Sequence, residues 1–257
     1  MIQRRRDYDK REPSRDAHII YIVCEGTGTE PAYFAFFEGL SSNLQVITIP
    51  PKDGTDPLKL MERAKQVLMG EERVSTVEYE HGDTVWFVID TDTWEREGKI
   101  LPLRNFCSEM NHGIPQKYDE VKAYSAWNVA QSNPCFEIWL YYHFYENRPE
   151  KELVDKFASF KEFVHKSISG GFDYEKDPVR IGDAIKNSET NIQRDVNGLL
   201  DIFSSELFLL AKEIEAFVKS EIQKLGNKLR WLLWIRFPLC HVVVALSQIS
   251  LVFTFSP

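Results

Sequence analysis

Several residues and motifs that mark particular classes of protein are scarce in this sequence or missing from it. Only 4 cysteines occur among 257 residues, and no two are spaced as C-x-x-C, which argues against a zinc site. Scattered cysteines of this kind favour a cytosolic protein with free thiols. There is no G-x-S-x-G motif and no GxxxxGK[ST] loop. The sequence therefore favours neither a serine hydrolase nor a P-loop nucleotide-binding protein.

Positive charge is in the minority. The chain has 31 lysines and arginines against 39 aspartates and glutamates, a formal net charge of −8. That balance excludes a protein that coats nucleic acid by bulk charge alone. It is compatible with a metal-dependent nuclease, because bound divalent ions reverse the local sign of the charge. Residues 1–16 are rich in arginine, and we expect a flexible arm there, either a solvated tail or a segment that touches phosphate. No apolar stretch follows those arginines, so we do not expect a signal peptide.

Short apolar runs alternate with helical patterns through residues 17–148. Runs rich in β-branched and aromatic residues predict buried strands at His18–Cys24 and Thr84–Ile89, and further strands at Gln45–Pro50 and Val121–Trp127. The alternation implies parallel strands joined by right-handed crossovers, and hence an α/β fold. Helices are predicted after a Thr29 cap and at Asp56–Met69, Leu101–Met110 and Pro134–Phe144.

The C-terminal part of the chain changes character. Residues 149–222 carry helical patterns, KELVDKFASFKEFVHK and LLDIFSSELFLLAKEIEAFVKSEIQKL, which predict a helical extension of the α/β domain. Residues 223–257 form an atypical apolar tail, in which the run Phe237–Phe255 nearly reaches the length of a membrane span. Pro238, His241 and Gln248 interrupt that run, so a buried or misannotated terminal segment is favoured over a membrane anchor.

Acidic residues follow two of the predicted strands. Glu25 comes directly after the first strand, and Asp90 and Asp92 follow the third. Sites in parallel sheets form at the carboxyl ends of the strands, and strand alternation would point both aspartates to one side. Converging carboxylates repel one another, and Mg²⁺ would relieve that repulsion and orient a phosphodiester. The alternative is that Glu25 is a lone exposed carboxylate and the aspartates belong to a solvated turn.

Three further charged residues are candidates for a supporting role. Glu30 either complements a helix dipole or is a carboxylate that supports the metal-binding acids without binding the metal itself. Glu137 is either an ordinary first-turn acid, with Asn133 as the helix cap, or a carboxylate that faces the acidic cluster. Lys52 is either a solvated loop lysine or a contact for the scissile phosphate. His143 lies among aromatic residues, and we interpret it as a packed core residue.

Three stretches of the sequence resemble the RloB family, a branch of the topoisomerase–primase (Toprim) superfamily. They are IVCEGTGTEPAYFAFF at Ile22–Phe37, VWFVIDTD at Val85–Asp92 and SNPCFEIWLYYHF at Ser132–Phe144. The resemblance extends from about His18 to Leu200 and leaves out the tail. It implies a Toprim-like parallel sheet with flanking helices. It also implies that Glu25 acts as a general acid/base or contacts the metal, and that Asp90 and Asp92 are ligands of Mg²⁺ or Mn²⁺.

The resemblance also implies an activity and a setting. RloB-like proteins are similar to Toprim nucleases of phage defence, which are encoded beside an ABC-type ATPase, so the expected activity is cleavage of RNA or DNA. The alternative is a non-catalytic subunit that binds the ATPase or nucleic acid. One position departs from the pattern of some Toprim nucleases, because Thr93 stands where another acid can follow the Asp-x-Asp; Glu95 or Glu30 is the candidate substitute. The choice of RNA or DNA, the number of metal ions and homo-oligomer formation are left open.

Overall fold

The computed structural model describes residues 10–14, 16–70, 75–114 and 124–236, with side chains described as far as residue 228. Two short 3-10 helices cover Tyr79–His81 and Asp177–Arg180. The strands and α-helices follow one another as β1 (His18–Cys24), α1 (Thr29–Phe34), β2 (Leu44–Ile49), α2 (Pro57–Leu68), β3 (Thr84–Asp90), α3 (Ile100–His112), β4 (Trp127–Asn133), α4 (Glu137–Tyr141), α5 (Lys151–Val154), α6 (Phe160–Ser167), α7 (Ile181–Asn191), β5 (Ser204–Ser205) and α8 (Leu207–Arg236).

The strands form one sheet in the order β2-β1-β3-β4-β5. The first four run parallel, while the two-residue β5 pairs with β4 in the antiparallel direction. Cys24 lies opposite Val88, and Asp90 lies opposite Ser132, so the carboxyl ends of β1, β3 and β4 meet at one edge. The prediction of an α/β fold with a mainly parallel sheet and flanking helices is confirmed.

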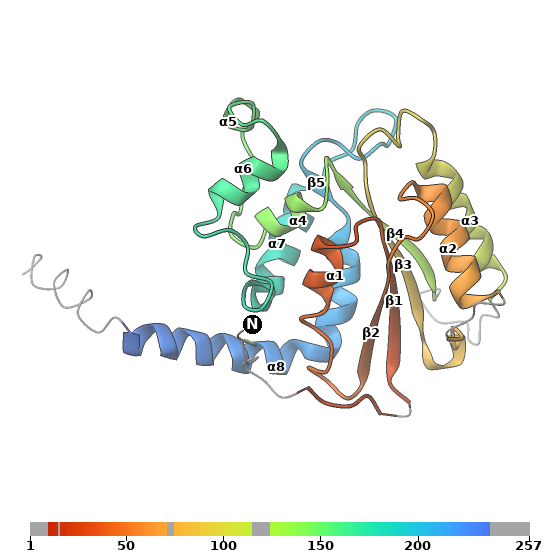
Figure 1. The fold of residues 1–257 in the computed structure, drawn as a ribbon, viewed down its shortest axis with the longest axis horizontal. Coiled ribbons are helices and arrows are strands. Elements are labelled where there is room, and N and C mark those ends of the chain that lie inside the picture. Colours follow the sequence, from red (N-terminus) through yellow and green to blue (C-terminus); the bar gives the residue numbers. More distant parts are fainter. Residues whose placement is uncertain (1–9, 15, 71–74, 115–123, 237–257) are drawn as a thin grey trace, which may run out of the picture.

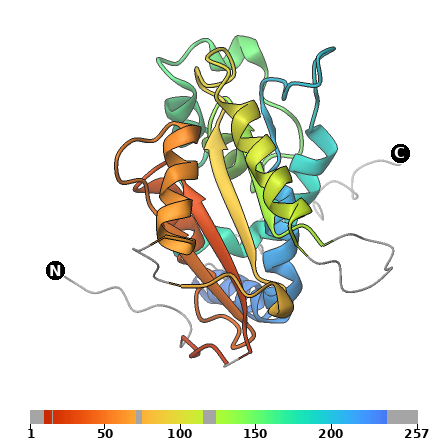
Figure 2. The same cartoon turned by 90° about the vertical axis from the view of Figure 1, so that its right-hand side faces the viewer.

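Helices cover both faces of this sheet, as Figures 1 and 2 show. On β1, Ile20 and Ile22 pack into one apolar cluster, with α1, α4 and α8, while Tyr21 and Val23 pack into the other, with α2 and α3. Strands β1 and β3 are buried on both faces, because successive side chains point to opposite sides of a strand and each side meets helices. That explains why their sequences are continuously apolar rather than alternating.

The structure corrects three predicted elements. The fourth strand begins at Trp127, where the prediction of Val121–Trp127 ended, and residues 121–123 lie outside the described part. The helical pattern over residues 151–166 divides into α5 and α6, because Ser159 accepts a hydrogen bond from the Glu162 amide and caps a new helix. The pattern that began at Leu199 becomes a helix only at Leu207, since β5 intervenes.

Helix α8 joins the C-terminal part of the chain to the sheet. Its residues Leu207, Leu210, Ile214 and Val218 are buried at helical spacing against the sheet. From the same helix, the Glu213 carboxylate accepts hydrogen bonds from His18 Nε2, Thr84 Oγ1 and Trp86 Nε1 at 2.5–2.9 Å. The predicted helical extension therefore shares one core with the α/β part.

The two predicted terminal segments are described only in part. Within the arm, the Arg11 amide donates to Gly39 O at 2.8 Å and the Ser14 amide donates to Ser42 O at 2.7 Å, while residues 1–9 lie outside the described part. Most of the apolar tail, residues 237–257, lies outside it as well. Of the helices that are described, none combines the length and the apolar character that crossing a bilayer requires.

A buried carboxylate fastens β4 to the chain that returns through β5. Glu206 is 3% exposed, and its carboxylate accepts hydrogen bonds from the Gln131 amide at 3.1 Å and from Arg104 at 2.7 Å. It also pairs with Arg194. Carboxylates are seldom buried unless their lone pairs are satisfied, so this junction depends on all three donors being present.

We expect Glu206→Ala to lower the free energy of unfolding by about 2–3 kcal/mol, because it removes the acceptor of the Gln131 amide and the anionic partner of two arginines. The matched control is Glu189→Ala, which removes an exposed pair with Lys212 and should change stability by no more than about 0.5 kcal/mol. Urea denaturation followed by circular dichroism measures both. Equal shifts in the two variants would contradict the role given to Glu206.

Candidate active site at the carboxyl edge of the sheet

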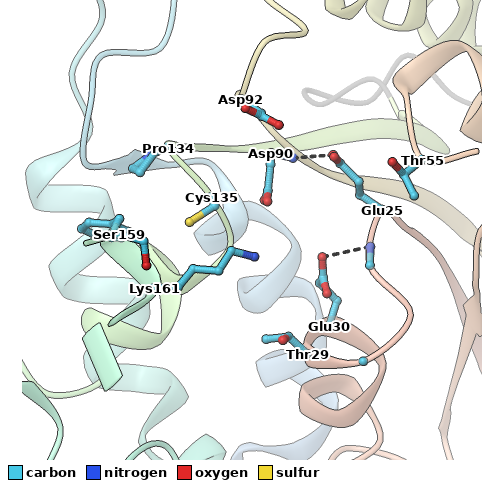
Figure 3. A pocket seen from close by; sticks show the side chains of 13 residues that line it. Glu25, Thr29, Glu30, Thr55, Asp90, Asp92, Pro134, Cys135, Ser159 and Lys161 are labelled. Atoms are coloured by element: carbon cyan, nitrogen blue, oxygen red, sulfur yellow. Dashed lines mark hydrogen bonds between the residues drawn. The ribbon is translucent and has the colours of Figure 1, made fainter. Parts of the chain in front are cut away.

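A pocket of about 570 Å³ opens at the edge where the parallel strands end. It brings together segments that are far apart in the sequence: the β1–α1 turn, the loop before α2, the end of β3, the β4–α4 turn and the amino end of α6 (Figure 3). The lining residues are Glu25, Gly26, Gly28, Thr29, Glu30, Thr55, Asp90, Asp92, Pro134, Cys135, Ser159, Phe160 and Lys161. The three predicted acidic residues therefore share one pocket.

Glu25 points toward the turn that carries the aspartates. Its Oε2 accepts a hydrogen bond from the Asp90 amide at 2.9 Å, and its Oε1 accepts one from Trp94 Nε1 at 2.9 Å. The interpretation of Glu25 as a lone exposed carboxylate is wrong. Burial raises the pKa of Glu25 above its usual value, and the nearby charges of Glu30 and Asp92 add to that rise, while the two hydrogen bonds oppose it.

Asp90 is the last residue of β3, and its Oδ1 accepts a hydrogen bond from the Phe136 amide at 2.8 Å. Burial raises the pKa of Asp90 to about 8, and the negative charges of Glu25, Glu30 and Glu137 push it in the same direction. A carboxyl group with this environment holds its proton near neutral pH unless a cation compensates the surrounding charge.

Asp92 reaches the pocket by a route that strand alternation did not predict. The strand ends at Asp90, and Asp92 adopts a left-handed backbone conformation with φ of 33°. Between the two aspartates, Thr91 is buried and donates from Oγ1 to Ser132 O at 3.0 Å, while it accepts from Gln131 Nε2 at 2.8 Å. The anchored Thr91 turn, rather than a strand repeat, brings both aspartates to the pocket.

Two of the three supporting candidates lie at this site. Glu30 is buried, lines the pocket and accepts from the Gly26 amide at 3.1 Å; a Cβ at position 26 would collide with its carboxylate. Glu137 is buried, and its charge raises the pKa values of both Glu30 and Asp90, so it faces the acidic group. Lys52 is exposed and does not line the pocket; Thr55, from the same loop, does.

The expected helix caps were wrong. Gly28, not Thr29, occupies the cap of α1, and no side chain caps that helix. Asn133 ends β4 and donates from Nδ2 to Leu200 O at 2.7 Å, so it does not cap α4. His143 is fully buried, with its Nε2 hydrogen-bonded to the Tyr33 hydroxyl and its Nδ1 to Trp139 O. Burial lowers its pKa to about 3, as expected for a packed histidine.

Sequence reasoning missed the residues that face the acids across the pocket. Lys161 and Ser159 come from α6 and the cap before it, more than 65 positions after Asp92 in the chain. The spacing Ser159-x-x-Glu162 is a capping-box signal that could have located the start of α6. Nothing in the sequence indicates that this helix end lies opposite β1 and β3, because that placement comes from tertiary packing.

The donor set at this edge suits a hard divalent cation. Glu25, Asp90 and Asp92 offer oxygen ligands only, which Mg²⁺ and Mn²⁺ prefer. A bound cation would also offset the repulsion between their negative charges. Across the described residues, no three histidine, cysteine, aspartate or glutamate side chains already stand close enough to enclose an ion. The carboxylates would therefore have to move toward one another on binding, with solvent filling the remaining ligand positions.

The raised pKa of Asp90 predicts how stability depends on pH without divalent ions. The unfolded chain loses this proton near the ordinary aspartate pKa of 3.8, whereas the folded protein keeps it until about pH 8. The stability contributed by the protonated form is therefore complete below pH 3.8 and is lost as pH rises toward 8. We expect thermal melts to show wild type losing stability relative to Asp90→Asn across this window, and Mg²⁺ restoring stability to wild type only.

The charge-matched control for that comparison is Asp53→Asn, which alters an exposed aspartate outside the pocket. Its pH profile should run parallel to that of wild type, and it should keep the response to Mg²⁺. Parallel profiles for wild type and Asp90→Asn would contradict the charge environment described here.

Comparison with known proteins gives one match. A model of the family described as RloB-like protein matches residues 20–214. No curated protein and no solved structure matches the chain. The matched range includes the strand ends that carry Glu25, Asp90 and Asp92, the whole of α6, and the first part of α8. The match thus takes in every segment that builds the pocket and most of the chain, and the protein belongs to the RloB-like family.

Proposed function

We propose that this protein is a divalent-metal-dependent nuclease whose active site is the acidic pocket at the carboxyl edge of the sheet. The observation that carries the proposal is the convergence of acidic residues from two neighbouring parallel strands, with Glu25 hydrogen-bonded to the Asp90 amide. Such a set of oxygen donors in an open pocket suits a metal ion shared with the phosphate of a substrate. Mg²⁺ or Mn²⁺ bound there would polarise the phosphodiester and lower the pKa of a bound water.

The residues of the pocket have separate tasks in this proposal. Asp90 and Asp92 would hold the cation. The hydrogen bonds of Thr91 to Ser132 and Gln131 fix the turn that carries both aspartates. The Asp90 amide and the Trp94 indole orient the Glu25 carboxylate through both of its oxygens. Burial raises the pKa of Glu25, and a raised pKa suits a carboxyl group that exchanges a proton with water or with a leaving oxygen.

The wider setting is proposed from the resemblance of the sequence. The mainly parallel sheet and the positions of Glu25, Asp90 and Asp92 are what a Toprim-like domain would have. By the same resemblance, we propose that the protein is the effector of an anti-phage system and works with an ABC-type ATPase. The fold carries no information about the substrate, so RNA and DNA are equally part of the proposal.

The competing function is that of a non-catalytic subunit that binds the ATPase or nucleic acid. It is favoured by one observation, that within the described part of the chain no three potential ligands are already grouped around a common point. The two functions differ in what the carboxylates do: a nuclease requires them for turnover, whereas a binding subunit tolerates their replacement.

We expect Glu25→Ala and Asp90→Ala each to reduce Mg²⁺-dependent cleavage by at least about 100-fold, because each removes an interaction with the reacting groups. The assay incubates the full chain, alone and with its ATPase partner, with mixed tRNA and with plasmid DNA, in Mg²⁺ and in EDTA. Folding of each variant is checked by circular dichroism.

The matched control is Glu97→Ala, since Glu97 is exposed, lies a few residues beyond the Asp90 turn and bonds to Thr93 and Lys99 rather than entering the pocket. It should cleave at the wild-type rate. Cleavage that survives Asp90→Ala would show that this pocket is not the active site. Wild-type protein that binds nucleic acid and never cuts it would favour the competing function.

A further inference from the structure

The wall of the pocket that faces the acids carries a lysine. Lys161 lines the pocket, and Figure 3 shows its amine pointing into the pocket toward Asp90 and Glu30 on the opposite side. Its Nζ is 3.3 Å from Glu137 Oε1. The Lys161 side chain is 63% exposed, whereas that of Glu137 is 12% exposed. The amine is therefore anchored at one point and open to whatever enters the pocket.

The helix that carries Lys161 is fixed at the end nearest the pocket. Ser159 Oγ accepts from the Glu162 amide at 3.1 Å, and Glu162 Oε2 accepts from the Ala158 amide at 3.1 Å. The pair resembles a capping box, with the Ala158 amide in place of the amide of the cap residue Ser159. Phe160 stacks on Phe203 with ring centroids 5.4 Å apart. Lys161 thus projects from a rigid element rather than a loop, and the amino end of α6 adds a favourable field for an anion.

The charges around the pocket are divided between its two sides. Glu25, Glu30, Asp90 and Asp92 supply the negative side, and among the described lining residues Lys161 alone is cationic. A cation held by the acids leaves a bound phosphate with charge still to be neutralised from the opposite side. A lysine has three N–H donors, so Lys161 can keep its contact with Glu137 and donate to a phosphate oxygen as well.

The pair with Glu137 is also too weak to occupy Lys161 fully. At 3.3 Å and with an exposed lysine, such a pair adds little to stability. Glu137 Oε2 is buried and has no hydrogen-bond partner among the described residues, so the pair leaves the carboxylate only half satisfied. The contact positions the amine at the pocket without using up its donors.

We propose that Lys161 binds a backbone phosphate of the nucleic acid that enters this pocket, opposite the acidic edge, with Glu137 as its positioning residue. This inference rests on the proposed function, since it concerns the substrate of the same site. The ligand chemistry is a phosphodiester of either RNA or DNA, and both are tested below. A lysine that only neutralised Glu137 would make no contact with the substrate.

The test measures the affinity for end-labelled tRNA and, in a parallel arm, for an end-labelled DNA duplex, in Ca²⁺ in place of Mg²⁺ and over a range of salt concentrations. The slope of log K against log salt is negative, and loss of one phosphate contact makes it shallower by about 0.7 for single strands and about 0.9 for duplex DNA. We expect Lys161→Met to make the slope shallower by about this amount on the bound nucleic acid, and Lys161→Arg to restore it.

Two further variants separate a phosphate contact from a structural role. Lys166→Met removes an exposed lysine of the same helix that does not line the pocket, and it should leave the slope at the wild-type value. Combining Glu137→Gln with Lys161→Met removes both charges of the pair. The slope should stay reduced in that double variant, whereas recovery to the wild-type slope would mean that Lys161 only neutralises Glu137, and would overturn the inference.

The cleavage assay distinguishes failure of this inference from failure of the proposed function. If wild type binds and cleaves, and Lys161→Met matches it in slope and rate, Lys161 has no phosphate contact while the nuclease proposal stands. If wild type neither binds nor cleaves either nucleic acid, the proposed function fails and the inference fails with it.

Discussion

The parallel pairing of β1 with β3 is the constraint on which the site depends. Cys24 lies opposite Val88, and the Glu25 amide continues that ladder by donating to Val88 O at 3.2 Å. Because of this register, Glu25 emerges beside Asp90, and its carboxylate can accept the Asp90 amide. A shift of the register would separate the acids and would also turn buried side chains out of the two clusters that cover the sheet. The packing of the core and the geometry of the site are therefore fixed by the same hydrogen bonds.

Much of this arrangement could be predicted from the sequence. The apolar runs of β1 and β3 located strands that helices cover on both faces, and the rule that sites form at carboxyl ends brought Glu25 and Asp90 together. The placement of β4 and the division between α5 and α6 were missed, because both depend on short polar segments that periodicity describes poorly. Lys161 was missed for a different reason: helix α6 is held at the pocket by packing against α4 and Phe203, and no local pattern encodes that contact.

The turn that carries the two aspartates is held by a chain of hydrogen bonds that extends past β4 to Glu206. Gln131 donates to Thr91, and Arg104 donates both to Gln131 Oε1 at 2.8 Å and to the Glu206 carboxylate at 2.7 Å. The turn between Asp90 and Asp92 is thus tied to the junction that joins the C-terminal part of the chain to the sheet. The same buried carboxylate that holds the fold together also helps to hold the aspartates at the pocket, while Lys161 supplies the opposite charge.

The proposed nuclease requires carboxylates from two strand ends to share a divalent cation. A crystal of the full chain soaked in Mn²⁺, with the ion located by its anomalous scattering, tests this requirement. We predict a peak in the pocket within about 2 Å of oxygens from Asp90 and from Glu25 or Asp92, the usual distance for such ions. An occupied Mn²⁺ site elsewhere on the protein, with the pocket free of anomalous signal, would rule out a cation shared by these strand ends.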